Sequence, residues 1–562
     1  MKHYKFSELT YKPTDYSEVQ KEINQMKDKV VNATSIEEIK EVLKKYDDLE
    51  SKISYHNAYT YIRTSLDCTD QYYENACQQE AMGCARLEVS ELQNALCESK
   101  FSKDIDELYG GEFLRKLRNE AKLGAFGQEL LAREQELIGK YQQKKASVRC
   151  DFHDKSLSEG EILKYYQAVS REERIEARKS CSKAFLADKD SYFDILRELI
   201  HLRIQIAEAN GFDSYFAYAN LFHGRNDYGE TELREFCNQV KKYLVPIIKD
   251  IREDQKKELG IPDLKAYDLS LLFLSGNAVP KGDAKVLTQA SIKMYDSLSE
   301  ECGDFFHQMV DTESLNVESS PNKIAGMGFC ADLGKELLTF VFGNCNGTDN
   351  DVSVFTHEIG HAWQGYLSAN SGLPYTLQNP PTDIAEIPSK TMELFSYPYA
   401  EGFFGKDADK FRQGHIKKAV LGIAAYCEIF EIETYLYTHP DAPVSDWIAA
   451  QMRIEKEYEP DIDFGVIQRD IEEGSALIRN MAIYMFPRYV ISYALSEMCA
   501  MDLFAAMEKD KKSAWESYTT LCSAGGSLAY PDLLVKCGLR PAYEDGVVKR
   551  IAEFIKQKMK TI

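Results

Sequence analysis

Apolar residues recur along most of this chain at the spacing of an α-helix, and this pattern limits the possible folds more than any other feature. An early example is the stripe formed by Val19, Ile23, Met26 and Val30. Their spacings of four, three and four residues place them on one helix face. Similar patterns fill most of the first 140 residues and return after about residue 348. The chain is therefore predicted to be mainly α-helical.

Strand signals are few, and the composition agrees with a helical fold. The chain has 32 Gly and 16 Pro among 562 residues, which is below the roughly 12% of an average protein. All-β folds need more frequent turns. Val148, Cys150 and Phe152 alternate with polar residues and predict a short strand. A Gly-rich turn, Ala325–Cys330, precedes the strand-like run Leu337–Phe342, so we expect a small sheet beside the helix that follows.

A soft boundary near residue 200 divides the chain into two predicted domains. The first is an N-terminal helical domain of residues 1–200. The second, residues 201–562, carries the motifs described below. No linker rich in Pro or Ser separates them, so the two halves are expected to pack against each other.

Charge and cysteine usage exclude several classes of protein. The 68 basic and 90 acidic residues give a net charge of −22, which argues against a nucleic-acid partner. The chain has no run of about 18 apolar residues, so no membrane span is predicted. The 14 Cys form no C-x-x-C pair, and Met1–Asp15 lacks the apolar region of a signal peptide. We therefore expect a cytoplasmic protein with reduced thiols and leave its oligomeric state open.

The strongest chemical signal is the pentapeptide His357-Glu358-Ile359-Gly360-His361. On a helix, positions i and i+4 lie on one face, so His357 and His361 can bind one metal ion. Glu358 can then take a proton from a water that the metal activates. The alternative is an accidental match on an amphipathic helix, which the 10 His of the chain make rare.

A catalytic zinc site needs a third protein ligand. The positions that define other H-E-x-x-H families hold unsuitable residues, namely Gln364, Leu367, Pro380, Pro381 and Ala385. Glu386 is the first acid in a persuasive setting, although it can also form a capping box with Asp383. Glu393 lies on the same helix face if the helix continues past Pro388. It can accept a hydrogen bond from a ligand His, or it can be a solvated acid.

These residues resemble peptidase family M3, the group of thimet oligopeptidase and oligoendopeptidase F. The bacterial oligoendopeptidase F and Pz-peptidase branch is the most similar. The resemblance rests first on the zinc motif followed by Glu386-Ile387-Pro388-Ser389. Further matching segments are Arg225–Tyr228, Asn344–Thr348, Gly525–Ser527 and Asp532–Leu534.

The resemblance implies a mainly α fold in which two helical halves enclose a deep substrate channel. It also implies one zinc ion held by His357, His361 and Glu386, with Glu358 as the general base. The substrates would be short unstructured peptides. The run Leu337–Phe342 would be an edge strand to which a peptide backbone adds.

One segment departs from the family pattern. The family usually has Trp, His and Phe where this chain has Leu477, Ala482 and Arg488, and its Phe-Gln-His is Ile432-Glu433-Thr434 here. Hydrolysis needs a donor to the oxyanion. The phenols left to supply it are Tyr484, Tyr489 and Tyr493, with Arg488 as a possible helper. Packing in the core is the alternative role for each Tyr.

Three functional hypotheses follow from these residues. The first is a zinc-dependent oligopeptidase that cuts internal bonds of short peptides. The second, motivated by Ala482 and Thr434, is a zinc-bearing peptide-binding protein with weak or lost catalysis. The third is a metallo-exopeptidase.

Overall fold

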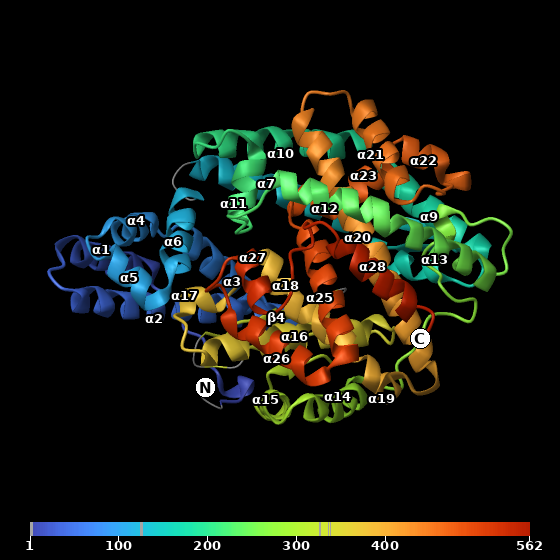
Figure 1. Ribbon diagram of the computed structural model, residues 1–562. Coiled ribbons are helices and arrows are strands. Elements are labelled where there is room, and N and C mark those ends of the chain that lie inside the picture. The colour runs from blue at the N-terminus through green and yellow to red at the C-terminus, as the bar shows by residue number, and fades with distance from the viewer. Residues whose placement is uncertain (1–3, 124–126, 325–326, 335–336, 338) are drawn as a thin grey trace. The chain divides into compact units, whose positions relative to one another are not determined.

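The computed structural model describes residues 4–123, 127–324, 327–334, 337 and 339–562. Within these ranges the chain is mainly helical, with one two-stranded and one three-stranded sheet, which confirms the predicted fold class (Figure 1). Ala325, Gly326 and Leu338, which belong to the predicted turn and strand, lie outside the described residues. None of the helices in these ranges is both long and apolar enough to cross a membrane.

The chain divides into two compact units, and each is discontinuous in sequence. The first comprises Met1–Ala125, Val279–Ala408 and Cys499–Pro541, and the second comprises Phe126–Ala278, Asp409–Met498 and Ala542–Ile562. This division follows packing rather than chain order. The domains expected at 1–200 and 201–562 stay a prediction.

Most of the first unit is built from helices. They are η1 (Phe6–Glu8), α1 (Tyr16–Asn32), α2 (Ile36–Leu66), α3 (Gln71–Ala85), α4 (Ser90–Glu98), α5 (Ser102–Tyr109), α6 (Gly111–Leu123), α14 (Ala284–Leu298), α15 (Glu300–Asp311), α16 (Asn350–Asn370), α17 (Tyr375–Gln378), α18 (Thr382–Phe395), η4 (Tyr397–Tyr399), α19 (Ala400–Phe404), η5 (Gly405–Asp407), α26 (Lys511–Ala524) and α27 (Tyr530–Lys536). Helix α25 (Ile491–Lys509) enters this unit at Cys499.

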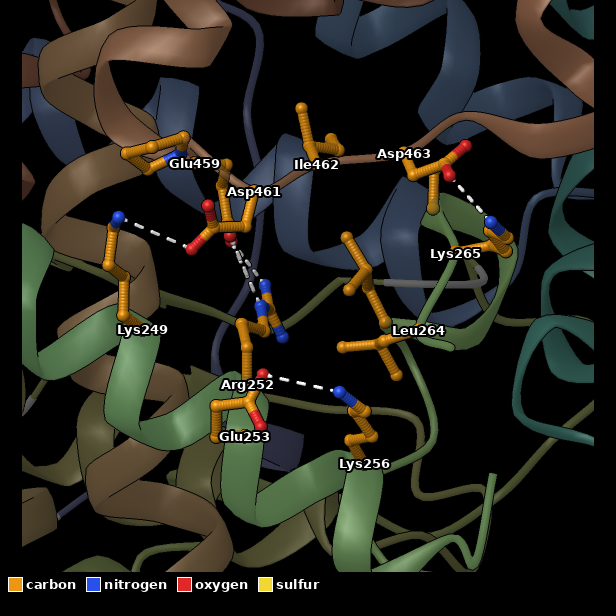
Figure 2. Close-up of a pocket in the computed structure, with 13 residues that line it drawn as sticks. Lys249, Arg252, Glu253, Lys256, Leu264, Lys265, Glu459, Asp461, Ile462 and Asp463 are labelled. Atoms are coloured by element: carbon orange, nitrogen blue, oxygen red, sulfur yellow. Dashed lines mark hydrogen bonds and ion pairs between the residues drawn. The ribbon is translucent and has the colours of Figure 1, made fainter. Parts of the chain in front are cut away.

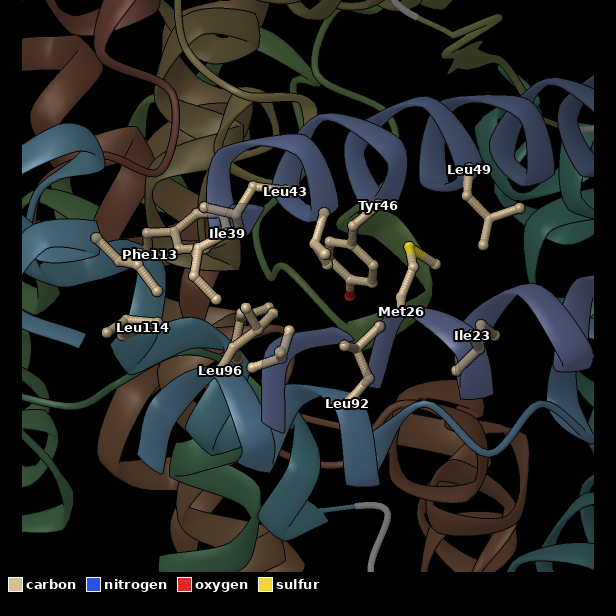
Figure 3. Packing of buried hydrophobic residues seen from close by; sticks show 14 of the residues in the cluster. Ile23, Met26, Ile39, Leu43, Tyr46, Leu49, Leu92, Leu96, Phe113 and Leu114 are labelled. Atoms are coloured by element: carbon tan, nitrogen blue, oxygen red, sulfur yellow. The ribbon is translucent and has the colours of Figure 1, made fainter. Parts of the chain in front are cut away.

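The N-terminal helices share one apolar core, which Figure 3 shows. The predicted stripe Val19, Ile23, Met26 and Val30 is buried in it, with no side chain more than 5% exposed. Leu377 of α17 packs into the same core. The periodicity that predicted these helices therefore also predicted their buried face, and the core joins them to the segment just before α18.

The three-stranded sheet lies in the first unit and has the order β3-β5-β4, from β3 (Leu315–Asn316), β5 (Phe340–Phe342) and β4 (Phe329–Ala331). Strand β5 pairs in parallel with β3 and antiparallel with β4. The prediction that Leu337–Phe342 forms an edge strand is wrong, because β5 is the central strand. All three β5 side chains are fully buried, as expected of a strand covered on both faces. The edge strand beside it is β4, part of which we had predicted as a turn.

Helices α16 and α18 approach each other closely at Gly360. A Cβ atom there would lie 2.6 Å from Ser389 Cα and 2.7 Å from Pro388 O. Only glycine permits this contact between the two helices. Helix α16 is also anchored by the fully buried Trp363, three residues after Gly360, which contacts Phe305 at a ring-centroid distance of 5.3 Å. The relative position of α16 and α18 is therefore fixed by packing.

The second unit contains the remaining elements. They are α7 (Gln128–Ser147), β1 (Cys150–Phe152), β2 (Lys155–Leu157), α8 (Glu159–Leu163), η2 (Lys164–Gln167), α9 (Arg171–Leu186), α10 (Lys189–Ala209), α11 (Tyr215–Phe222), α12 (Glu230–Tyr243), α13 (Val245–Glu258), η3 (Ala266–Asp268), α20 (Ala408–Thr438), α21 (Val444–Tyr458), η6 (Gly465–Ile467), α22 (Gln468–Glu472), α23 (Ser475–Arg479), α24 (Met481–Met485), the start of α25, and α28 (Val547–Lys558). Strand β1 confirms the strand predicted from alternation, and it pairs antiparallel with β2.

The contact at Gly360 gives a test of how the helices are held. We expect Gly360→Ala to lower the free energy of unfolding by about 1–3 kcal/mol, because the new methyl group meets backbone atoms that cannot move aside. Gly365→Ala on the same helix is the matched control, since its Cβ would approach only the Thr339 Cγ2 atom, at 3.1 Å. Urea denaturation measures both variants. Equal stability of the two would contradict the close packing at Gly360.

Candidate metal centre

Three potential metal ligands converge between α16 and α18. His357 and His361 lie one turn apart on α16, and Glu386 lies on α18. Their ligand atoms all lie within 4.8 Å of one another. Glu386 Oε2 is 3.3 Å from His357 Nε2 and 3.4 Å from His361 Nε2. The group predicted from sequence is thus brought together, and it can hold a metal ion.

These distances fit a tetrahedral zinc site. Ligand atoms placed about 2.0–2.1 Å from a tetrahedral ion lie about 3.3 Å apart. The two measured N–O distances, 3.3 and 3.4 Å, are close to that value. The His357 and His361 side chains remain 16% and 22% exposed, so the group is reached from solvent. Two imidazoles and one carboxylate also form a donor set that zinc prefers.

Glu393 orients the first of the two imidazoles. Helix α18 continues through Pro388, which places Glu393 Oε1 2.7 Å from His357 Nδ1. Nδ1 donates a hydrogen bond to this carboxylate, and Nε2 is the ring nitrogen that faces Glu386 and that can bind a metal ion once its own proton is displaced. Lys390 donates a hydrogen bond to the same Glu393 oxygen at 3.0 Å. With 5% of its surface exposed, Glu393 is not a solvated acid.

Glu386 is held by its own helix rather than used as a cap. Ser389 Oγ donates a hydrogen bond to Glu386 Oε2 at 3.0 Å. The N-cap of α18 is Pro381, and no side chain caps the helix, so the alternative of a capping box with Asp383 is wrong. Ser389 belongs to the segment Glu386-Ile387-Pro388-Ser389 that resembles the family, but its contact with the ligand carboxylate was not predicted from the sequence.

The carboxylates make this site strongly attractive to a cation. Burial opposes a charge on His357, but the hydrogen bonds with Glu386 and Glu393 outweigh it and raise the imidazole pKa to about 10. Burial likewise opposes a charge on Glu386, but His361 and His357 hold the pKa of this carboxyl well below its usual range. The site therefore favours a positive charge, whether a proton or a metal ion.

Glu358 lies beside the ligands, and its side chain is also close to the segment that leads into β4. It is 7% exposed, and burial raises the pKa of its carboxyl, although both neighbouring imidazoles lower it. A Cβ on Gly328, just before β4, would lie 3.5 Å from Glu358 Cγ. Burial, and then the Glu358 carboxylate, raise the pKa of the Cys330 thiol in β4. The edge strand thus lies next to this acid, an arrangement that the sequence did not reveal.

The three tyrosines named as donors lie in the second unit and differ in their surroundings. Tyr484 is fully buried, stacks on Tyr141 at 3.9 Å between ring centroids, and donates a hydrogen bond to the Tyr192 carbonyl. It therefore has a core role, as the alternative interpretation held. Tyr489 and Tyr493 are half-buried and adjacent, with their hydroxyl oxygens 3.4 Å apart.

Arg488 is an internal ion-pair residue rather than an exposed donor. It has no exposed surface, and its φ angle is +66°. Its guanidinium donates to the carboxylate of Glu230, to the Phe430 carbonyl at 2.9 Å and to Thr434 Oγ1 at 2.8 Å. Two of the departures from the family pattern, Thr434 and Arg488, thus contact each other. We therefore exclude Arg488 from the set of oxyanion donors.

Comparisons with known proteins agree with this geometry. Residues 6–123 match the model of the peptidase M3 N-terminal domain, and residues 165–553 match that of peptidase family M3. No curated protein gives a significant match.

Several solved structures match the whole chain. A structure assigned as an oligoendopeptidase F has 29% identity and a TM-score of 0.91, with 100% of this chain and 99% of that chain covered. Pz peptidase A, solved with an inhibitor, has 28% identity and a TM-score of 0.91, with 99% of each chain covered. One assigned as an oligoendopeptidase F from Bacillus anthracis str. Ames has 27% identity, a TM-score of 0.85, and 99% and 98% coverage. The family models span most of the sequence, and the chain belongs to peptidase family M3.

Proposed function

We propose that this protein is a zinc-dependent oligopeptidase that hydrolyses internal bonds of short, unstructured peptides. The observation that carries the proposal is the convergence of His357, His361 and Glu386, with the buried Glu358 beside them. Zinc bound by these three residues supplies a Lewis acid that polarises the peptide carbonyl and acidifies a water molecule. The other steps are the work of the chain's own residues.

Glu358 is the residue proposed to move protons. Its carboxylate receives a proton as water attacks the carbonyl carbon, and it then delivers that proton to the nitrogen of the leaving amine. Burial raises the pKa of this carboxyl and brings it nearer to neutrality, which helps it both accept and return a proton. Glu393 supports the reaction indirectly by holding the tautomer of His357 through Nδ1.

The edge strand β4 is the proposed binding site for the peptide backbone. It lies at one end of the sheet order β3-β5-β4, and Gly328 brings it against α16 near Glu358. A substrate added as a further strand would be held through its main chain, whatever its side chains. This mode suits extended peptides and excludes folded proteins, whose backbone is already paired.

The proposed donors to the oxyanion are Tyr489 and Tyr493. Both are half-buried phenols whose hydroxyl oxygens lie 3.4 Å apart, although only Tyr493 is helical, because Tyr489 lies in the turn just before α25. A neutral hydroxyl that donates a hydrogen bond to the developing negative charge stabilises the transition state more than the substrate. Tyr484 is left out of this proposal because its hydroxyl is already committed in the core.

A second candidate is a peptide-binding protein that holds zinc but turns over slowly. The observation that favours it is the contact between Arg488 and Thr434, which occupies positions where the family usually has Phe and His. Ala482 likewise offers no side-chain donor. This candidate predicts zinc and peptide binding without cleavage.

The first test is hydrolysis of a quenched peptide of about ten residues, with added zinc and with a chelator. We expect Glu358→Gln to lower kcat by roughly 10²–10⁴-fold while the zinc content is unchanged, because only the proton acceptor is lost. Mass spectrometry of the products shows whether the cut is internal or terminal. Full activity in this variant would remove Glu358 from the mechanism, and no cleavage by the wild type would favour the peptide-binding candidate.

The second test concerns the support of the metal ligands. We expect Glu393→Ala to weaken zinc binding by roughly 10–100-fold, because His357 loses the partner of its Nδ1. The carboxylates raise the His357 pKa to about 10, so zinc binding at pH 7 displaces a proton, and affinity rises with pH across the neutral range. Calorimetry in buffers of different ionisation enthalpy measures both quantities. Unchanged affinity in this variant would contradict the role of Glu393.

The third test separates the tyrosines. We expect Tyr489→Phe or Tyr493→Phe to lower kcat by about 10²–10³-fold with little change in KM, because a transition-state hydrogen bond is lost. Tyr484→Phe is the matched control and should retain kcat, since its hydroxyl bonds only within the core. Steady-state kinetics on one peptide compares the three. If neither of the first two variants slows turnover, the oxyanion donor lies elsewhere.

A further inference from the structure

A second cavity of functional interest lies wholly within the second unit. It has a volume of about 270 Å³ and is lined by α7, by α11 and by the segment that follows α24. Tyr489, the proposed oxyanion donor, forms part of its wall, together with Tyr215, Tyr218, Phe222 and Phe486. The cavity therefore shares one residue, Tyr489, with the proposed catalytic groups, and no residue of the metal centre lines it.

The rim of the cavity is aromatic and unusually exposed. Phe222 and Phe486 keep 64% and 45% of their surface in contact with solvent. His223 connects them to the donor, since its ring lies 5.2 Å from that of Phe222 and 5.9 Å from that of Tyr489. Phe486 lies 6.3 Å from Tyr489 between centroids. Large apolar side chains gathered at the mouth of a cavity are typical of a binding site.

The charged groups of the cavity are already paired. Arg203 Nε donates to Glu134 Oε1 at 2.6 Å, and the other guanidinium nitrogens donate to the Ile483 and Tyr484 carbonyls and to the Tyr437 hydroxyl. Arg203 is 1% exposed. An anionic ligand would therefore find no free cation here, and the lining favours an apolar occupant.

The cavity in Figure 2 provides a contrast. It also lies in the second unit, but each of its charged side chains is paired with a neighbour, as in Lys249–Asp461 and Lys256–Glu253. Its walls contain no aromatic ring, and its charges are paired with one another, so nothing in it selects a ligand. The aromatic cavity differs because a ligand that covers its exposed rings removes apolar surface from water, which is favourable.

The size of the aromatic cavity limits its occupant. Sites for whole small molecules usually measure about 300–1,000 Å³. At about 270 Å³ this cavity is smaller than that range, so it suits one side chain of a larger ligand. A peptide is such a ligand, because its main chain is held through hydrogen bonds and only its side chains need pockets.

We propose that the aromatic cavity is a specificity pocket that takes one aromatic or large aliphatic side chain of the substrate peptide. The inference rests on the proposed function and adds the substrate class, namely peptides that carry such a side chain. The occupant would pack against the Tyr489 ring. A substrate that fills the cavity would thus also hold the oxyanion donor in place and raise kcat as well as lower KM.

The test uses a series of quenched peptides that differ at one position, with Ala, Leu, Phe or Asp placed in turn at each site around the cut. We expect one position to prefer Phe over Ala by about 10-fold or more in kcat/KM. Phe222→Ala and Phe486→Ala should reduce that preference. Ile138→Trp, which puts a bulky indole ring in place of an aliphatic side chain of the wall, should abolish it by filling the cavity. Leu163→Ala on α8 is the control, because this residue is similarly exposed at 43% and does not line the cavity.

Binding measured separately distinguishes this inference from the proposed function. Fluorescence anisotropy with labelled Phe and Ala peptides reports the pocket without any cleavage. If the wild type binds the Phe peptide more tightly, and Ile138→Trp removes the difference, the pocket is supported even if no peptide is cut. If peptides are cut but no cavity variant changes the side-chain preference, the specificity pocket is wrong and the peptidase proposal stands.

Discussion

The site depends on one close contact between two helices. Gly360 on α16 and the Pro388–Ser389 backbone on α18 approach to a distance that no side chain allows. This contact brings Glu386 to 3.3 and 3.4 Å from the two imidazole nitrogens, and it brings Glu393 within reach of the far side of His357. A glycine inside the zinc motif is thus as important to the geometry as the ligands on either side of it.

Packing, rather than the metal, places these ligands. Trp363 and the apolar face of α16 are buried, and Ser389 holds the Glu386 carboxylate from within α18. Together the imidazoles and carboxylates create an excess of negative charge that favours a cation.

The sequence predicted the metal half of the site well and the second unit poorly. The His pair followed from helical spacing, and so did the placing of Glu393 on one face with Glu386, because a helix fixes which residues share a face. Glu386 itself was named from its sequence setting and from the family resemblance. The position of β5 was missed because its partners, β3 and β4, come from separate segments, and pairing between segments leaves no local signal. The surroundings of Tyr484 and Tyr489, five residues apart, could not be distinguished either, since burial depends on helices distant in sequence.

The ion pair around Arg488 has a consequence for how this chain can change. Glu433 has no exposed surface, and burial raises the pKa of its carboxyl to about 7, with Arg488 the strongest of the charges that oppose this rise. Arg488 in turn depends on Thr434 and Glu230 for its hydrogen bonds. Replacing Arg488 alone with Phe, the residue usual in the family, would leave Glu433 and Glu230 without their positively charged partner. A bulkier residue at position 434 would collide with the guanidinium. Residues 230, 433, 434 and 488 are therefore coupled through their contacts, and a change at one of them requires compensating changes at the others.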